Sequence, residues 1–243
     1  LVHDDVVDSS DTRRGAAAVQ VKWNNKVAVL IGDYILAKVI GLTAEVRNIR
    51  ILEIVANLGK SLSSGEMVQL HVGQSMWIDE ERYFQVIEQK TAQLFQACVE
   101  AGAESAGCTP RQRAALRDYG RFLGICFQIK DDIFDYYNDP VIGKPTGNDL
   151  REGKRTLPLI HVLANDNAPG VDEMRALSEK SHLNADEIDT LIRYAKDNGG
   201  IEYAEQKMYE LRDEAFAILD EFDSTSEIQA FKDLFSFVIE RNV

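Results

Sequence analysis

Apolar residues recur along this chain with the spacing of helices rather than of strands. The segment 27–42 (VAVLIGDYILAKVIGL) is apolar nearly all round, which predicts a helix buried at the centre of a bundle. The segment 48–70 continues in helical periods, and residues 79–107 begin acidic and end in small residues and glycine, as a helix does. No alternating pattern longer than a few residues indicates a strand. The pattern predicts an all-α fold.

The second half of the chain holds another long helix and one long loop. Residues 109–137 are predicted to be helical, with Thr109 as the N-cap and Pro110 at the first helical position. Residues 138–158 contain three of the five prolines and three glycines, which predicts a structured loop. Long loops inside compact domains are often functional. Helical spacing then returns to the end, so we expect one domain of about ten helices with no linker.

The composition narrows the function classes. A formal net charge of −13 over 243 residues disfavours nucleic-acid binding, which needs a basic face. The three cysteines (Cys98, Cys108 and Cys126) show no CxxC pair and no metal-ligand spacing. We see no signal peptide and no apolar run approaching the ~20 residues that cross a bilayer. We therefore expect no transmembrane segment and a cytoplasmic location.

The motif Asp-Asp-x-x-Asp occurs twice, in HDDVVD (3–8) and in DDIFD (131–135). Residues four apart on a helix differ by about 40° around its axis, so Asp4 and Asp8 point the same way. Asp131 and Asp135 have the same relationship. Carboxylates stacked among apolar residues are costly unless cations compensate them. Two copies of the motif therefore indicate cation binding more strongly than one copy would.

Oxygen ligands on a helix face suit Mg²⁺, which prefers one or two carboxylates together with waters and substrate phosphates. Two such helices facing each other would bind a diphosphate as its metal complex. Arg13 and Arg14 follow the first motif, and Lys144 and Lys154 follow the second. Metal ions and basic side chains together neutralise the charge on a departing diphosphate. No Cys-His or Ser-His-Asp signature indicates a protein nucleophile.

Six blocks, in order, resemble the trans-prenyltransferases, or polyprenyl diphosphate synthases. They are HDDVVDSSDTRRG, IGDYIL, SSGEMVQL, EQKTAQLF, FQIKDDIFDY and GKPTGNDLREGKRTLP, and together they cover essentially the whole chain. The resemblance implies a bundle of the isoprenoid synthase type around a central active-site cavity. It also implies a Mg²⁺-dependent enzyme that joins an allylic diphosphate to isopentenyl diphosphate, head to tail, giving a trans-polyprenyl diphosphate. A homodimer and three Mg²⁺ ions in each active site belong to the same expectation.

The resemblance also assigns roles to individual residues. The principal metal ligands would be Asp4, Asp8 and Asp131. The carboxylates that ligate further or hold these ligands would be Asp5, Asp132 and Asp135. The side chains that contact the allylic diphosphate would be Arg13, Lys90 and Lys144, with Lys154 closing from the loop, while Arg14 would face isopentenyl diphosphate. The catalytic residues would be Lys90, Thr91, Gln128 and Lys144, and of these Thr91 and Gln128 would place their oxygens near the reacting carbon. Oxygen dipoles such as those of the threonine and the glutamine suit a carbon that becomes cationic.

Each of these residues has a simpler alternative. For Lys90 the alternative is a solvated lysine, for Gln128 a filler of a polar gap between helices, and for Thr91 a side chain that bonds back to its own helix. Asp33 and Glu66 also match family blocks, and we expect them to be structural supports because polar groups in apolar helices need partners.

The chain departs from the family pattern at its start. It begins without Met inside a predicted helix, and it lacks the Gly-Gly-Lys-Arg motif that the family uses for isopentenyl diphosphate. We therefore expect residues 1–243 to be one polyprenyl synthetase domain without its N-terminal helices. Alone, these residues are expected to condense substrates weakly or not at all while retaining metal-diphosphate binding.

Two features bear on product length. The first motif has two residues between its aspartate pair and its last aspartate, where many short-chain members of the family have four. Ala37 and Gly41 are small and leave room for a growing chain. Both favour a long, octaprenyl-like product. The alternatives are a farnesyl or geranylgeranyl diphosphate synthase, a terpene cyclase and a non-catalytic partner subunit.

Overall fold

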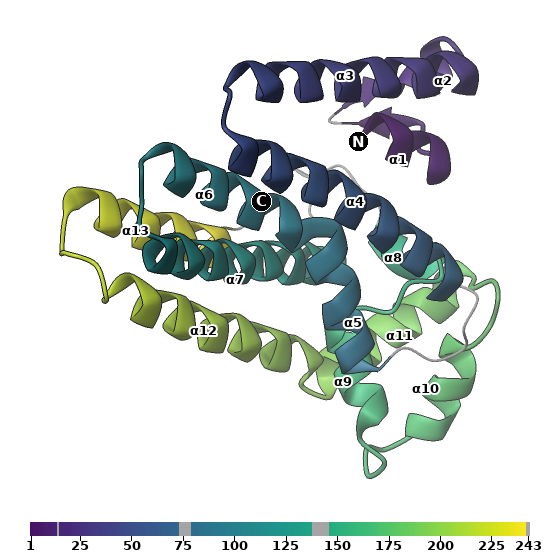
Figure 1. Cartoon of the computed structure of the whole chain (residues 1–243). Helices are drawn as coiled ribbons and strands as arrows, with labels where there is room; N and C mark the ends of the chain where they lie inside the picture. The colour runs from purple at the N-terminus through teal and green to yellow at the C-terminus, as the bar shows by residue number, and fades with distance from the viewer. Residues whose placement is uncertain (14, 73–78, 138–145, 242–243) are drawn as a thin grey trace. The chain divides into compact units, whose positions relative to one another are not determined.

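The computed structural model describes residues 1–13, 15–72, 79–137 and 146–241, and most of them are helical (Figure 1). The prediction of an all-α fold is confirmed. The chain divides into two compact units, Leu1–Asn57 and Leu58–Val243, and each is described by itself. That residues 1–243 form a single domain stays a prediction.

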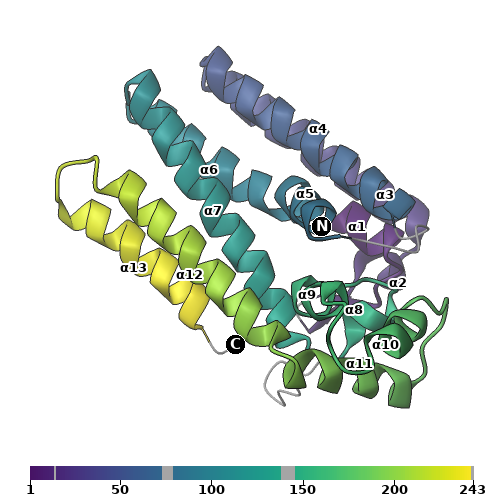
Figure 2. The same cartoon turned by 90° about the horizontal axis from the view of Figure 1, so that it is seen from below.

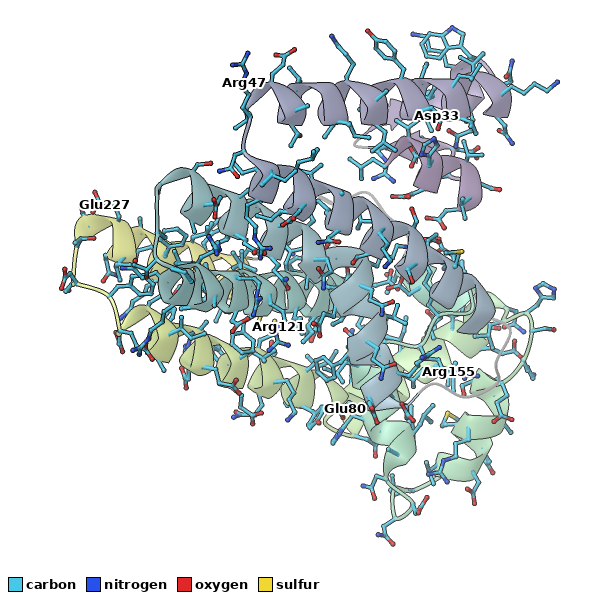
Figure 3. All side chains as sticks on the ribbon, viewed as in Figure 1. Asp33, Arg47, Glu80, Arg121, Arg155 and Glu227 are labelled. Atoms are coloured by element: carbon cyan, nitrogen blue, oxygen red, sulfur yellow. The ribbon has the colours of Figure 1, made fainter. Side chains whose placement is uncertain are left out.

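The first unit combines short helices with one small hairpin. Its elements are α1 (Val2–Val7), β1 (Thr12–Arg13), β2 (Ala16–Ala17), α2 (Val19–Lys22), α3 (Asn25–Glu45) and the first turns of α4 (Ile49–Val72), and the two strands pair antiparallel. Helix α1 packs on α3 through Gly32, where an added Cβ would lie 2.4 Å from Nε2 of His3. The same ring nitrogen lies 3.2 Å from the carboxylate of Asp33, the partner expected for this polar residue (Figure 3).

Helix α3 confirms the helix predicted over 27–42 but not its burial. Only Ala28, Gly32 and Thr43 of α3 are buried. The large apolar side chains that remain exposed are Val29, Leu30, Tyr34, Ile35, Leu36, Val39, Ile40 and Leu42, with Leu30 at 66% and Tyr34 at 65%. An apolar surface of this extent is typical of an interaction site.

By length and composition, α3 is also long and apolar enough to cross a membrane. One such helix among the described residues is weak evidence for a membrane span, so the expectation of no transmembrane segment is not overturned. Asp33 and Lys38 interrupt the apolar run of α3. Charged side chains near the middle of a helix are costly in a bilayer.

The second unit is a helical bundle. Its elements are the rest of α4 from Leu58 onward, α5 (Glu80–Ile87), a π-helical turn η1 (Glu88–Ala92), α6 (Gln93–Ser105), α7 (Pro110–Phe134), α8 (Asn148–Arg151), α9 (Leu157–Ala164), α10 (Val171–Ser178), α11 (Ala185–Asp197), α12 (Gly200–Leu219) and α13 (Ser226–Glu240). Helix α7 lies between α6 and the pair α12 and α13, which run alongside it (Figure 2). Its buried face joins a core whose largest fully buried side chains include Tyr119, Phe235 and Ile129.

The start of α7 agrees with the sequence. Thr109 accepts a hydrogen bond from the backbone N–H of Gln112, and the glutamine side chain accepts one from the backbone N–H of Thr109. Pro110 occupies the first turn, where no N–H is needed. Of the predicted loop, residues 138–145 lie outside the described residues. The rest is partly helical, because it contains α8 and the start of α9.

Candidate active site

The first acidic motif presents two of its three carboxylates to solvent. Asp4 and Asp8 lie one turn apart, since the backbone N–H of Asp8 donates to the backbone oxygen of Asp4 at 2.7 Å. The Asp4 side chain is 41% exposed, and Asp8 is exposed. Hard anionic oxygens at this spacing can share one cation or flank two.

Asp5 has a different environment. It is 2% exposed, and its Oδ1 accepts hydrogen bonds from Nε and Nη2 of Arg13 at 2.7 and 2.6 Å. The hydrogen bond to Asp5 raises the pKa of Arg13. Gln20 braces the same turn by donating to the backbone oxygens of Asp5 and Ser10. The carboxylate of Asp5 therefore orients Arg13, whose remaining N–H groups are left to meet an anion.

The second acidic motif ends α7, and there too one carboxylate is buried. Asp132 is 5% exposed, and it accepts hydrogen bonds of 2.7 Å from the hydroxyl of Tyr83 and from Nε2 of Gln128. Burial raises the pKa of Asp132, and the nearby Asp149 adds to that rise. Two strong donors on a buried carboxylate fix its position and the position of both partners.

The hydrogen bonds continue from Asp132 to the predicted catalytic threonine. Thr91 donates to Oε1 of Gln128 at 2.7 Å, and Gln128 donates through its other amide atom to Asp132. The amide can satisfy both bonds in one orientation only, with its oxygen toward Thr91. The structure thus brings the predicted pair Thr91 and Gln128 together and leaves a lone pair on each oxygen for a developing positive charge.

Thr91 and Lys90 lie on the π-turn η1, which interrupts the helix predicted over 79–107. Such turns are rare and frequently occur at functional sites. The turn is packed tightly by two glycines: an added Cβ at Gly124 would lie 2.5 Å from Cα of Ala92, and one at Gly65 would lie 3.0 Å from Cβ of Gln89. The close contacts at these two glycines hold the π-turn in one position against α7 and α4.

Lys90 is held by an acidic partner. Its Nζ lies 3.0 Å from Oε2 of Glu66 on α4, and the lysine side chain is 28% exposed. The other carboxylate oxygen of Glu66 is buried without a hydrogen-bond partner among the described residues. The simple alternative of a fully solvated lysine is wrong for Lys90. Glu66 acts as a support, as expected.

Asp135 supports the loop that follows the motif. Its two carboxylate oxygens accept the backbone N–H groups of Asn148 and Asp149 at 2.9 and 3.0 Å, and so cap α8. Gly147, at φ +74°, makes the turn that allows this. Beyond α8, Lys154 pairs with Glu152 at 2.5 Å. Asp135 therefore orders the segment that carries Lys154.

Asp131 is the second motif's exposed carboxylate, with 41% of its side chain accessible. It pairs with Arg241, which follows α13 and lies 110 residues away. Neither this arginine nor Tyr83 was predicted from the sequence. Both reach their aspartates from distant segments, and no local pattern signals such a pairing. Arg14 and Lys144 lie outside the described residues.

Within the described ranges, no three His, Cys, Asp or Glu side chains gather into a ready metal site. The first motif belongs to the first unit and the second motif to the second unit, and each is described separately. A depression of about 580 Å³ is lined by residues that were not predicted for the site, among them Tyr136, Asp189 and Lys196. The central cavity stays a prediction.

Comparison with known proteins assigns the family. Residues 1–195 match the Polyprenyl synthetase family. An octaprenyl diphosphate synthase of Escherichia coli (strain K12) is 35% identical over 246 residues, covering 100% of this chain and 75% of that protein. The chain therefore belongs to the polyprenyl synthetase family of trans-prenyltransferases, as the six sequence blocks predicted.

Solved structures agree in fold. A geranylgeranyl pyrophosphate synthase from Bacteroides thetaiotaomicron is 40% identical with a TM-score of 0.86, over 99% of this chain and 75% of that one. A polyprenyl synthase from Caulobacter crescentus, complexed with calcium and isoprenyl diphosphate, is 34% identical with a TM-score of 0.90, over 100% of this chain and 74% of that one. These relatives include makers of both long and short products.

Proposed function

We propose that this protein condenses an allylic diphosphate with isopentenyl diphosphate, head to tail, to give a long trans-polyprenyl diphosphate. The observation that carries the proposal is that each acidic motif contains both accessible and buried carboxylates. Asp4, Asp8 and Asp131 present accessible carboxylates, whereas Asp5 and Asp132 are buried in hydrogen bonds. The first two aspartates of each motif repeat one arrangement, an accessible carboxylate followed by a buried one, whereas a purely structural acidic stripe would not require that repetition.

The accessible carboxylates fit Mg²⁺. Asp4, Asp8 and Asp131 are the residues that would hold it, since hard anionic oxygens leave its other positions to water and phosphate. Bound Mg²⁺ would neutralise the diphosphate and stabilise the negative charge of its departure. The calcium and isoprenyl diphosphate in the relative from Caulobacter crescentus support a cation-dependent diphosphate site. We propose three such ions per site.

The chain's own basic side chains would share the charge of the diphosphate. Arg13, oriented by Asp5, and Lys90, held by Glu66, are positioned before substrate arrives. Lys154 follows the capped helix α8, and Arg14 and Lys144 complete the proposed set. Positioned cations stabilise developing charge without reorganising during the reaction.

The oxygens of Thr91 and Gln128 would face the allylic carbon as its bond to the diphosphate breaks. Because Thr91 donates its only proton to Gln128, its lone pairs point away from that bond. The isopentenyl double bond attacks the cationic carbon, and a proton is then lost to the released diphosphate. No protein nucleophile is needed.

The test is a pair of measurements on the purified protein, prepared with any residues that precede Leu1 in the natural chain, since residues 1–243 alone are expected to turn over weakly. Calorimetric titration of Mg²⁺ in the presence of inorganic diphosphate reports the metal site, and radiolabelled isopentenyl diphosphate with an allylic primer reports turnover. Asp131→Ala is expected to abolish Mg²⁺-dependent turnover, and Asp172→Asn, on an exposed residue of α10, serves as the matched control. Near-normal turnover in Asp131→Ala would refute the metal assignment.

Sizing of the labelled products tests chain length. We expect an octaprenyl-like product, supported by the two-residue spacing of the first motif. Ala37 and Gly41 are exposed on α3, so they do not line a pocket in this structure. The second candidate is a short-chain synthase, favoured by the 40% identity to a geranylgeranyl pyrophosphate synthase. A dominant farnesyl or geranylgeranyl product would establish that candidate instead.

We further propose that the exposed apolar side chains of α3 form the contact with a second copy of the chain. Asp33 and Lys38 within the helix favour a protein partner over a bilayer. Leu30→Glu and Leu36→Glu together are expected to convert a dimer into a monomer in light-scattering measurements. Leu234→Glu on α13, another exposed leucine, is the control.

A further inference from the structure

Arg241 lies directly after α13 and reaches the last turns of α7. Its guanidinium carbon lies 4.2 Å from the ring centre of Phe127 and 5.4 Å from that of Phe134. The side chain is 14% exposed. An aromatic cage of this kind removes water from a guanidinium while leaving its charge intact.

The hydrogen bonds of this guanidinium are directed at the second acidic motif. Nη2 of Arg241 donates to Oδ1 of Asp131 and, at 3.2 Å, to the backbone oxygen of Phe127. Nε is buried and has no hydrogen-bond partner among the described residues. Arg241 therefore contacts Asp131 through Nη2, while its Nε makes no hydrogen bond among the described residues. A group in that condition loses less on leaving its place than a fully bonded one does.

A metal ion and Arg241 compete for the same carboxylate. Oδ1 of Asp131 already accepts a hydrogen bond from Arg241. An approaching dication is repelled by the positive charge of this partly desolvated guanidinium. Mg²⁺ can take Asp131 only if the arginine moves or the negative charge of a diphosphate offsets the repulsion.

We propose that Arg241 is a positioning residue that holds Asp131 in the absence of metal and is displaced when Mg²⁺ arrives with diphosphate. The inference rests on the proposed function, in which Asp131 is a metal ligand. Displacement would release the end of α13 from α7, so occupation of the metal site would be coupled to the C-terminal helix. The protein would thereby select the metal-diphosphate complex over free metal.

The competing explanation is that Arg241 only fastens α13 to α7. In that case its removal costs stability and leaves metal affinity unchanged. The two explanations predict different Mg²⁺ affinities for a variant without Arg241. If the arginine competes with the metal, the variant binds Mg²⁺ more tightly than wild type; if it only stabilises the packing of α13, the affinity does not change.

The experiment titrates Mg²⁺ by calorimetry, alone and with inorganic diphosphate, into wild type, Arg241→Gln, Arg241→Lys and Asp131→Asn. Arg111→Gln is the control, since it removes an ion pair between α7 and Glu221 at the opposite end of the helix. We expect Arg241→Gln to bind Mg²⁺ about fivefold or more tightly. Its gain should be larger for Mg²⁺ alone than with diphosphate, and Arg241→Lys should fall between it and wild type. Unchanged or weaker binding in Arg241→Gln overturns the inference.

Hydrogen exchange supplies a second readout that does not depend on turnover or on a variant that folds. In wild type, amides at the end of α13 are expected to exchange faster once Mg²⁺ and inorganic diphosphate are added, and unchanged exchange there overturns the inference. Asp131→Asn distinguishes failure of the proposed function from failure of the role assigned to Arg241. If it binds Mg²⁺ and diphosphate as wild type does, the proposed function fails. If it loses binding while Arg241→Gln matches wild type, only the role of Arg241 fails.

Discussion

Tyr83 and Asp132, 49 residues apart, share a 2.7 Å hydrogen bond between two buried side chains, and this bond ties α5 to the end of α7. The carboxylate also accepts from Gln128, which in turn holds Thr91. The position of the predicted catalytic threonine thus depends on a tyrosine that does not itself reach the reacting groups.

Replacing Tyr83 with phenylalanine removes one donor from a buried carboxylate. We expect Tyr83→Phe to lower the free energy of unfolding by about 1–3 kcal/mol, measured by urea denaturation. Turnover should fall as Gln128 and Thr91 lose their fixed orientation. Tyr209→Phe, at an exposed tyrosine on α12, is the control and should change neither quantity. Equal stability of the two variants would contradict the structural role of the bond.

The π-turn depends on the absence of a side chain at Gly124. A methyl group there would overlap the backbone at Ala92, so Gly124→Ala is expected to cost about 1–3 kcal/mol of stability and to reduce turnover by displacing Lys90 and Thr91. Gly102→Ala, where an added Cβ on α6 meets nothing within 4 Å, should instead stabilise the protein by up to about 1 kcal/mol. Thermal unfolding compares the two, and similar losses in both would argue against close packing at the turn.

Asp135 and Asp131 belong to one motif but are expected to respond differently to mutation. Asp135→Ala removes the cap of α8 and should lower stability by about 1–2 kcal/mol in urea unfolding. Asp131→Asn should weaken binding of Mg²⁺ with inorganic diphosphate by about tenfold or more in calorimetry. Asp135→Ala should affect that binding less. The reverse order of the two binding effects would show that Asp135 is the stronger ligand.

His161 gives the fold a dependence on pH. Its ring stacks on Tyr203 at 3.7 Å, and the tyrosine hydroxyl donates to both oxygens of Glu80 at 2.8 Å (Figure 3). Burial lowers the pKa of His161, with Glu80 opposing that effect. The unfolded chain therefore takes up a proton first as the pH falls below about 6.5, so stability is full above that pH and decreases below it.

The corresponding measurement is urea unfolding at several pH values between about 5 and 7.5. His161→Phe retains a ring to stack on Tyr203 but cannot be protonated, so its stability should depend less on pH than that of wild type. An identical slope for both proteins would show that the histidine does not contribute.

The sequence predicted what depends on local spacing. The cap at Thr109, the helices on either side of the acidic motifs and the family blocks are all read within a few residues, and the structure agrees with them. The resemblance assigned Thr91 and Gln128 to one reacting centre, and the structure shows a hydrogen bond between them that was not predicted; their catalytic role stays a prediction. The metal roles of the six aspartates stay predictions.

Contacts between segments far apart in the sequence could not be predicted from local spacing. Tyr83 and Arg241 look like ordinary helix residues until the fold brings them to Asp132 and Asp131. The exposure of α3 was missed for a related reason: an apolar helix has the same pattern whether its own chain or another molecule covers it. Periodicity also gave no sign that the helix at 88–92 widens.

That widened turn places one extra residue in the helix without changing the direction of the side chains before and after it. A π-turn accommodates one residue more than an α-helix of the same rise, and each residue turns a helix by about 100°. Deleting a single residue between Glu88 and Ala92 would let α5 run into α6 as an unbroken α-helix, at little cost in local backbone bonding. The side chains of α6 would keep their direction and their contact with α7, but the residues within the turn would shift around the helix, so that Lys90 and Thr91 would lose their contacts with Glu66 and Gln128. A single deletion in this segment is thus expected to spare the fold and abolish turnover, an asymmetry that a library of single-codon deletions would reveal.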